Sequence, residues 1–360
     1  MKISLLVPSA YGMRGDIRST LNLATELSKR HDIEVISVKR QREKPFFPVG
    51  PKVALRWLFD ARPGVRHLFP TGQVRADVAL WRMLRGLRSD VLITTRPGLA
   101  VHAARYAPRE ITRIAREWAR PPVPGPIRKF YPRLDAVVTA TESGLAEWRT
   151  LTGDPGQIHL IPDALPAGPW PRSRMDNRII AAGGRWVPAK AYDRLVRAFA
   201  IVVGKRPDWR LRLYGGGPEE KRLRHMVADL NLHNHVYFMG TTPDLSGEFA
   251  KASIVATTSR TEVPGMSVIE ALGCGVPVVG FDSQRGPGDF LVTGYNGVLV
   301  PEGGGEAEAY ALALLALIDD ERRRRSLAAG ALSTAMRHTA HVVAEQWETT
   351  IADLRGRGPA

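Results

Sequence analysis

The run Ile3-Ser4-Leu5-Leu6-Val7 opens the chain as a buried-strand pattern, and a glycine-containing turn after it leads into a helical pattern. In that second pattern Ile17, Leu21, Ala24 and Leu27 recur at a spacing that places them on one face of a helix. A strand, a turn and an amphipathic helix form the repeating unit of a parallel sheet covered by helices. The stretch therefore predicts an α/β domain.

The same alternation runs along almost the whole chain, in two series. Strand-like runs of the first series follow at Ile33–Val38, Val91–Thr95, Ile111–Ala115, Ala136–Ala140 and Ile158–Pro162. Those of the second are Arg178–Ala182, Leu211–Tyr214, Val236–Met239, Ile254–Thr258, Pro277–Phe281 and Val298–Val300. Helical patterns separate them, which indicates two doubly wound α/β domains.

The boundary between the series is rich in proline. Pro162, Pro166, Pro169 and Pro171 stand in a stretch without apolar periodicity, which is typical of a linker. At roughly 100–200 residues per domain, a chain of 360 residues also predicts two domains. We expect an N-terminal domain over 1–165, a linker over 166–177, a C-terminal domain over 178–338, and a helix over 339–355 that is free to pack back on the first domain. Ligands of such sheets bind at their carboxyl edges, so we expect the active site between the domains.

The charge of the chain is strongly positive and uneven. Lys and Arg number 51 against 36 Asp and Glu, which gives +15 and a pI near 10.3. Residues 1–165 carry +12 of this charge. Basic and large apolar side chains alternate there, at Lys44, Phe46, Phe47, Lys52, Arg56, Trp57, Phe59, Arg62, Arg66, Arg82, Arg85 and Arg88. Such a pattern suits an anionic membrane surface or a phosphate-bearing acceptor, and an arginine-rich proteome is the alternative explanation.

Several classes of protein are disfavoured by the same inspection. No apolar run approaches the ~20 residues of a membrane-spanning helix, and the N-terminus has no cleavage-site pattern of a signal peptide. The single cysteine, Cys274, excludes an internal disulfide and suits a reducing compartment. We therefore expect a cytoplasmic protein, with peripheral association with the cytoplasmic face of a membrane left open.

The most specific stretch is Ser259-Arg260-Thr261-Glu262-Val263-Pro264-Gly265-Met266-Ser267-Val268-Ile269-Glu270-Ala271-Leu272-Gly273-Cys274-Gly275-Val276-Pro277-Val278-Val279. A strand ends just before it, a loop carries Glu262, and a Pro-Gly turn opens a helix that holds Ser267 and Glu270. The free N–H groups at a helix N-terminus suit a phosphate, and a carboxylate can accept hydrogen bonds from both hydroxyls of a ribose. The pattern thus suits a nucleotide-sugar.

A second stretch, Gly183-Gly184-Arg185-Trp186-Val187-Pro188-Ala189-Lys190, lies between the first strand and the first helix of the second domain. Arg185 and Lys190 are well placed there to bind a diphosphate, because arginine offers a fork of donors and lysine a point charge. A pair of solvated surface charges is the alternative reading.

These two stretches resemble the family-4 retaining glycosyltransferases of the GT-B fold, in which two Rossmann-like domains face each other across a cleft. The family's mark is a Glu-x(7)-Glu pattern followed by a Gly-x-Pro-Val-Val strand, which match Glu262 with Glu270 and the end of the stretch above. The resemblance implies that Arg185 and Lys190 stabilise the departing diphosphate. It also implies that Glu262, with the backbone at Gly265, Met266 and Ser267, holds the sugar and β-phosphate, and that Glu270 holds the ribose. The glycine that usually follows the lysine is Ala191 here.

Weaker parts of the resemblance lie in both domains. Gly184, Gly215 and Gly216 match donor-binding turns of the family, and Gly12, Arg14 and Gly15 match its N-terminal loop for the diphosphate or the acceptor. Trp118 stands where members often carry a histidine that faces the donor sugar. A tryptophan that faces the cleft there would change the contact with the donor sugar, and ordinary core packing of Trp118 is the alternative.

The function expected from the sequence is transfer of a sugar from a UDP-, GDP- or ADP-sugar to an acceptor hydroxyl of a glycan, lipid or polymer. We expect no cofactor, no metal and no nucleic-acid partner, since we find no Asp-x-Asp or other metal motif and no nucleic-acid-binding module. Open alternatives are a nucleotide-sugar epimerase or a phosphorylase of the same fold, a degenerate transferase that only binds, and a basic nucleic-acid-binding protein.

Overall fold

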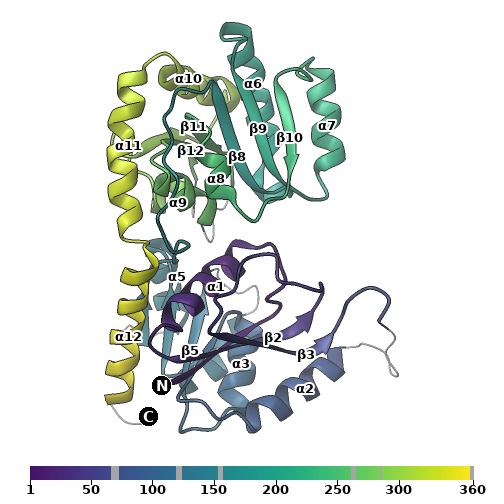
Figure 1. The fold of residues 1–360 in the computed structure, drawn as a ribbon, viewed down its shortest axis with the longest axis vertical. Coiled ribbons are helices and arrows are strands. Elements are labelled where there is room, and N and C mark those ends of the chain that lie inside the picture. The colour runs from purple at the N-terminus through teal and green to yellow at the C-terminus, as the bar shows by residue number, and fades with distance from the viewer. Residues whose placement is uncertain (66–72, 119–123, 153–156, 261–264, 284–285, 357–360) are drawn as a thin grey trace. The chain divides into compact units, whose positions relative to one another are not determined.

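The structure is a computed structural model that describes residues 1–65, 73–118, 124–152, 157–260, 265–283 and 286–356 of the chain (Figure 1). Contacts divide it into two units. Unit 1 comprises Met1–Ala167 together with Thr339–Ala360, and unit 2 comprises Gly168–His338. In the predicted linker, Ser173 and Asn177 already belong to unit 2, where their side chains bind the carbonyl oxygens of Ala252 and Lys251.

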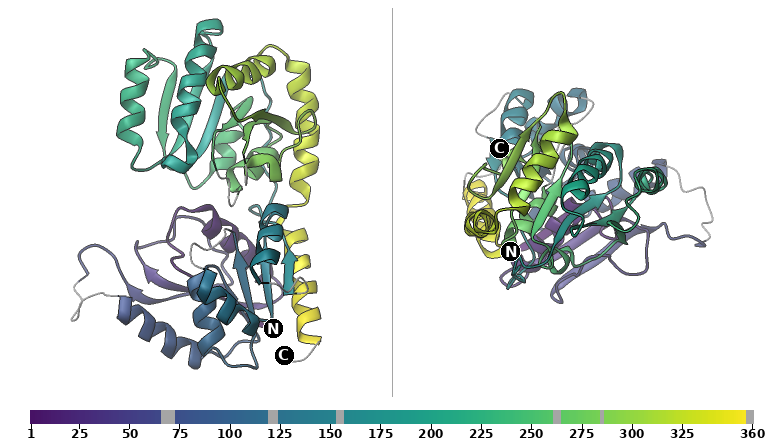
Figure 2. Two further views of the ribbon diagram at one scale, coloured as in Figure 1. Left: turned by 180° about the vertical axis from the view of Figure 1, so that it is seen from behind. Right: turned by 90° about the horizontal axis from the view of Figure 1, so that it is seen from above.

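Unit 1 is built on a parallel sheet with the strand order β3-β2-β1-β4-β5-β6-β7 (Figures 1 and 2). Its strands are β1 (Lys2–Val7), β2 (Asp32–Arg40), β3 (Val53–Asp60), β4 (Val91–Thr94), β5 (Thr112–Glu117), β6 (Ala136–Thr139) and β7 (Ile158–Leu160). Its helices are α1 (Gly15–Leu27), α2 (Gln73–Arg85), α3 (Pro97–Tyr106), α4 (Pro124–Phe130), α5 (Glu142–Thr152) and α12 (Ala340–Gly356), with the 3-10 helix η1 (Tyr131–Arg133).

Strand β3 is the main element of unit 1 that the strand patterns did not predict. It lies at the edge of the sheet, so the Arg56 and Trp57 side chains are exposed and the apolar pattern of a buried strand is broken. The run of basic and aromatic residues around it is therefore not one exposed surface, since Phe47 is 7% exposed and belongs to the core. Arg88 lies beyond the end of α2.

The core of unit 1 lies on both faces of its sheet. On one face, Leu21 of α1 and Trp347 of α12 pack with Ile3 and Val35. On the other, Leu84 of α2 packs with strand residues and with α3. The strands are buried on both faces because helices cover both, as the continuous apolar runs of the sequence indicate.

Unit 2 repeats the plan with the strand order β10-β9-β8-β11-β12-β13, again all parallel. Its strands are β8 (Ile179–Arg185), β9 (Arg210–Gly216), β10 (Val236–Gly240), β11 (Ile254–Thr257), β12 (Val278–Asp282) and β13 (Gly297–Pro301). Its helices are α6 (Tyr192–Lys205), α7 (Glu220–Asp229), α8 (Leu245–Phe249), α9 (Met266–Gly273), α10 (Glu306–Ile318) and α11 (Glu321–Met336), with the 3-10 helices η3 (Pro188–Lys190) and η4 (Pro287–Asp289).

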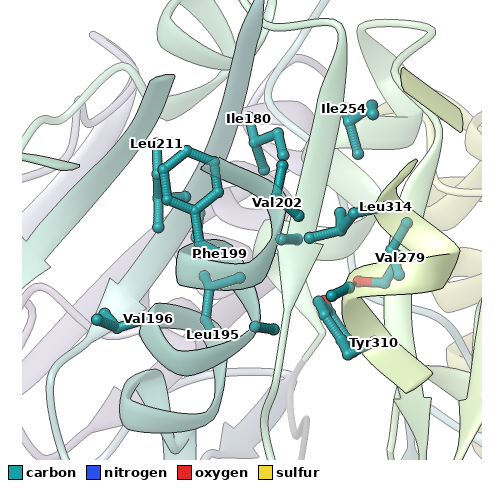
Figure 3. Packing of buried hydrophobic residues seen from close by; sticks show 14 of the residues in the cluster. Ile180, Leu195, Val196, Phe199, Val202, Leu211, Ile254, Val279, Tyr310 and Leu314 are labelled. Atoms are coloured by element: carbon teal, nitrogen blue, oxygen red, sulfur yellow. Dashed lines mark hydrogen bonds between the residues drawn. The ribbon is translucent and has the colours of Figure 1, made fainter. Parts of the chain in front are cut away.

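Helices α6 and α10 cover one face of this sheet, and their side chains form its main core (Figure 3). Phe199 and Leu195 of α6 lie over Ile180 and Leu211. The Tyr310 hydroxyl of α10 donates hydrogen bonds to the main-chain oxygens of Thr257 (3.0 Å) and Val279 (2.7 Å), at the carboxyl end of β11 and in β12. Because these helices hold the strands, the loops at the carboxyl edge leave from a rigid base.

No helix among the described residues is both long and apolar enough to cross a lipid bilayer.

Candidate functional site

The sheet of unit 2 reverses its strand order between β8 and β11, and such a switch point is where doubly wound sheets bind ligands. The loops that follow these two strands are bonded to each other. The Arg260 amide donates to the Ala189 carbonyl at 2.9 Å, and the Thr258 hydroxyl lies 2.9 Å from the Ala191 carbonyl and 3.2 Å from that of Lys190. The two motifs of the sequence analysis thus meet at one point of unit 2.

The two predicted diphosphate ligands lie on the β8 side of this point. Arg185 is the last residue of β8 and is exposed, and Lys190 ends η3 with its side chain half-buried. The Lys190 side chain passes close to Gly184. A Cβ atom added at Gly184 would lie 4.0 Å from the Lys190 Cε and 3.1 Å from the Tyr192 hydroxyl. Arginine and lysine side chains therefore flank the same strand-to-helix turn.

Ala191, next along this turn, has a left-handed backbone with φ 45° and ψ 46°. This conformation costs an alanine roughly 1–2 kcal/mol, whereas a glycine adopts it freely. The side chain is 3% exposed, so the surrounding core holds the residue in place. The replacement of glycine by alanine noted in the sequence leaves the turn intact at some cost in stability.

The ends of β8 and β9 lie so close together that only glycine fits at position 215, directly after Tyr214. Gly215 has φ 144°, and a Cβ on it would overlap the carbonyl oxygen of Gly184. Gly216 accepts a hydrogen bond from the Trp186 amide at 2.9 Å. These glycines let the backbone turn pack against the site, and any role in donor binding stays a prediction.

The opposite side of the switch point is the start of α9. Gly265 caps the helix and lies against the Phe290 ring, which leaves no room for a side chain. Met266 is buried, Ser267 is half-buried, and Glu270 is 2% exposed in the second turn. Glu262, the other carboxylate of the pattern, lies outside the described residues. The N-terminus of α9 and the buried Glu270 carboxylate in its second turn therefore follow β11 along the chain.

The predicted phosphate loop of unit 1 lies at the corresponding switch point, between β1 and β4. Gly12 and Gly15 are half-buried, and Arg14 is exposed with its Nε 3.0 Å from Asp16. The Arg96 guanidinium, at the end of β4, pairs with the other oxygen of Asp16. Burial raises the pKa of Asp16, although Arg14 opposes the shift. The buried Asp16 carboxylate thus connects Arg14 of this loop to Arg96, and the sequence motifs did not reveal this role.

Trp118 lies inside unit 1, where its indole donates to both oxygens of Asp163 at 3.0 Å and is 6% exposed. Asp163 also pairs with Arg116 at 2.6 Å and accepts from the Ser19 hydroxyl at 2.6 Å. The side chains of Arg116 and Asp163 are 1% and 2% exposed. Sequence inspection missed this network because its members come from α1, β5 and the segment after β7.

Glu117, between Arg116 and Trp118, is a second buried group that the sequence did not reveal. The Tyr131 hydroxyl donates to its Oε1 at 2.6 Å, and Tyr131 stacks on Trp148. Burial raises the pKa of the Glu117 carboxyl from 4.5 to about 8. The carboxyl is therefore protonated in the folded chain at neutral pH.

Folding stability should consequently fall as the pH rises from about 4.5 to about 8, because the unfolded chain loses this proton first. The slope contributed by one such group is at most about 1.4 kcal/mol per pH unit. We expect Glu117→Gln to remove that slope, since the amide oxygen can still accept from Tyr131. Urea unfolding of both proteins at pH 5, 6.5 and 8 measures it, and parallel pH curves would show that Glu117 ionises normally.

Among the described residues, no three His, Cys, Asp or Glu side chains gather as a metal site would require.

Two curated proteins are similar in sequence. An exopolysaccharide phosphotransferase of Streptomyces coelicolor is 34% identical over 99% of this chain and 41% of its own length. A poly(glycerol-phosphate) alpha-glucosyltransferase of Bacillus subtilis is 28% identical over 59% of this chain and 32% of its own length. The chain thus spans less than half the length of either relative.

The fold is shared with solved structures. The crystal structure of Anabaena HepE in complex with UDP-glucose matches 98% of this chain and 100% of its own, with a TM-score of 0.78 and 18% identity. The likeness confirms the expected fold class, an α/β chain with the two Rossmann-like domains of the GT-B fold. Residues 171–333, which make up nearly all of unit 2, match the family Glycosyl transferases group 1. This part of the chain, which holds Lys190 and Glu270, is therefore similar to the group 1 glycosyltransferases.

Proposed function

We propose that the chain is a retaining glycosyltransferase that moves a sugar from a nucleotide-sugar to an acceptor hydroxyl. The observation that carries the proposal is the junction at the switch point of unit 2, where the Arg260 amide bonds the Ala189 carbonyl at 2.9 Å. This junction brings the loop of Lys190 together with the loop that leads to α9 and Glu270. A basic turn beside a helix N-terminus suits a diphosphate.

The roles follow from the chemistry of each group. Arg185 and Lys190 neutralise the diphosphate as it departs, which is the main catalytic contribution because that charge grows in the transition state. The α9 N–H groups from Gly265 to Ser267 bind the β-phosphate. Glu270 accepts hydrogen bonds from the ribose hydroxyls. Glu262 keeps its predicted contact with the donor sugar. With these basic groups in place, the reaction proceeds without a metal ion, and the leaving phosphate accepts the acceptor proton.

The donor is proposed to be a nucleoside-diphosphate sugar with UDP, GDP or ADP as the carrier. The structural similarity to HepE, solved with UDP-glucose, supports the class of donor. The acceptor is proposed to be a hydroxyl on a glycan, lipid or polymer, in keeping with the glucosyltransferase relative that is named for poly(glycerol-phosphate).

A peripheral membrane location on the cytoplasmic side is proposed from the outer face of α2. Val78 and Trp81 are 50% and 38% exposed there, and the Arg85 guanidinium lies 5.4 Å from the centre of the Trp81 ring. Exposed apolar side chains beside a basic one suit the surface of an anionic bilayer.

A thermal-shift screen of UDP, GDP, ADP and their sugars tests the donor site. We expect one nucleotide to stabilise the chain, by about 2.7 kcal/mol at a concentration ~100 times its dissociation constant. Incubation with that donor and an acceptor should then give a glycoside of retained anomeric configuration.

Other outcomes separate the alternatives. Absence of any stabilising nucleotide would overturn the donor assignment. An isomerised sugar formed without acceptor would indicate an epimerase. A new phosphodiester that links the transferred sugar to the acceptor, in place of a glycosidic bond, would indicate the phosphotransfer for which the Streptomyces relative is named. Steeply salt-dependent binding to DNA or RNA would favour the nucleic-acid alternative.

A further inference from the structure

Unit 1 contains a surface cavity of about 490 Å³, broadly open to solvent, that none of the roles above uses. Its lining residues follow the carboxyl ends of β2 and β3. These two strands are neighbours at one side of the sheet (Figure 1). The residues that line it are Gln41, Arg42, Glu43, Arg62, Pro63, Gly64 and Val65. The cavity thus lies at the carboxyl edge of the sheet, where ligands of doubly wound sheets bind, and beside the switch point between β1 and β4.

Arg40, the last residue of β2, shapes one wall of this cavity. Its Nε donates to the Arg42 carbonyl at 3.1 Å and its Nη2 to the Glu43 carbonyl at 2.7 Å. The same guanidinium lies 4.3 Å from the centre of the Trp57 ring and 5.8 Å from that of Tyr11. The loop is therefore held in shape before any ligand arrives, which lowers the entropy cost of binding.

Arg62 and a tight turn form the other wall. Asp60 accepts from the Arg62 Nε at 3.0 Å, and this pair lowers the pKa of Asp60. The Val65 amide bonds the Arg62 carbonyl at 3.3 Å across Pro63 and Gly64, and Gly64 has φ 84°, which this turn requires of a glycine. Arg62 thus faces the cavity partly neutralised by Asp60.

Arg42 differs from Arg62 because it makes no ion pair within the described part of the chain. Its side chain is exposed, and its Nη2 lies 3.5 Å from the Met13 sulfur. Met13 belongs to the glycine loop that carries Gly12, Arg14 and Gly15. The cavity therefore adjoins the loop assigned to phosphate or acceptor, and it presents a planar guanidinium without a carboxylate partner.

We infer that this cavity binds a phosphodiester group of the acceptor, with Arg42 as its main ligand and Arg62 as the second. The inference rests on the proposed glycosyl transfer and names its acceptor class, a polymer or glycan that carries phosphodiesters. An arginine fork matches two phosphate oxygens, and the arginine without a carboxylate partner contributes most because it gives up no existing ion pair. Glu43 on the rim disfavours more highly charged phosphomonoesters.

Calorimetric titration of the full chain with an oligomer of glycerol phosphate tests the inference. We expect the wild type to bind it, Arg42→Gln to bind at least about tenfold more weakly, and Arg42→Lys to fall between them. Arg128→Gln on α4 is the matched control, since Arg128 is also exposed and the variant loses the same charge. The control should stay within twofold of the wild type.

An equal loss of oligomer affinity in Arg42→Gln and Arg128→Gln would show that binding depends only on the overall positive charge, and it would overturn the site. So would equal binding of a neutral maltose oligomer, tighter binding of inorganic phosphate than of the oligomer, or Arg42-dependent binding only to phosphatidylglycerol vesicles. The nucleotide thermal shift is measured on the same samples. A nucleotide response without oligomer binding refutes the cavity alone, and oligomer binding without a nucleotide response refutes the transferase.

Discussion

Replacement of Lys190 by alanine is expected to lower kcat for sugar transfer by about 10²–10³-fold while the chain stays folded. The size of the effect is that of removing one fixed donor from a developing negative charge. Lys190 ends η3, and its main-chain oxygen is bonded to the Thr258 hydroxyl at 3.2 Å, so its backbone is held beside the switch point. Because the leaving diphosphate gains charge in the transition state, kcat should fall more than donor affinity.

The matched control is Lys205→Ala. Lys205 is exposed at the last turn of α6 in the same unit, and the variant makes the same chemical change away from the switch point. Steady-state kinetics with the donor found in the thermal-shift screen give the comparison. A Lys190→Ala enzyme within tenfold of the wild type, or a Lys205→Ala enzyme with an equal loss, would overturn the assignment of the diphosphate site.

Asp163→Asn is expected to destabilise unit 1 by about 3–5 kcal/mol, because it removes the ion-pair partner of the buried Arg116 guanidinium. The two groups are 2.6 Å apart and almost fully buried, and burial lowers the pKa of Arg116. The ring centres of Trp118 and Trp347 lie 4.8 and 5.7 Å from the Arg116 Cζ. These rings carry no net charge, so they cannot replace the carboxylate. Urea unfolding at pH 7 measures the loss.

Asp77→Asn is the control for this experiment, since the Asp77 side chain is 51% exposed and lies 3.5 Å from the His102 Nε2. Its effect should stay within about 0.5 kcal/mol. Addition of Arg116→Met to Asp163→Asn should restore part of the stability, because the unpaired buried charge is then gone. A loss below 1 kcal/mol in Asp163→Asn would mean that water or a rearranged neighbour solvates Arg116.

The order of strands and helices could be predicted from the sequence because parallel strands covered on both faces give short continuous apolar runs. Ile3–Val7 and Ile254–Thr258 are such runs, and both form central strands, β1 and β11. Strand β3 could not be predicted in the same way. An edge strand with Arg56 and Trp57 exposed carries the mixed polarity that was interpreted as a basic surface.

The residues of the candidate site also differ in how far the sequence alone reveals them. Lys190 and Glu270 could be proposed as site residues from the sequence because local spacing and a helix start carry the signal. Arg116 and Asp163 are 47 positions apart, and Arg96 and Asp16 are 80 apart. No local pattern marks such pairs, since only the folded sheet brings the carboxyl ends of β1, β4 and β5 together. The raised pKa of Glu117 was hidden for the same reason.

The return of α12 to unit 1 sets the order in which the chain can complete its folding on the ribosome. Val343, Trp347 and Ile351 complete a core that begins with Ile3 and Leu21. Domains generally fold as units while the chain is synthesised. Unit 2 is continuous, so all of it emerges before unit 1 receives its last helix. During that interval an apolar face of unit 1 is open to the solvent and to chaperones, although its strands were made first.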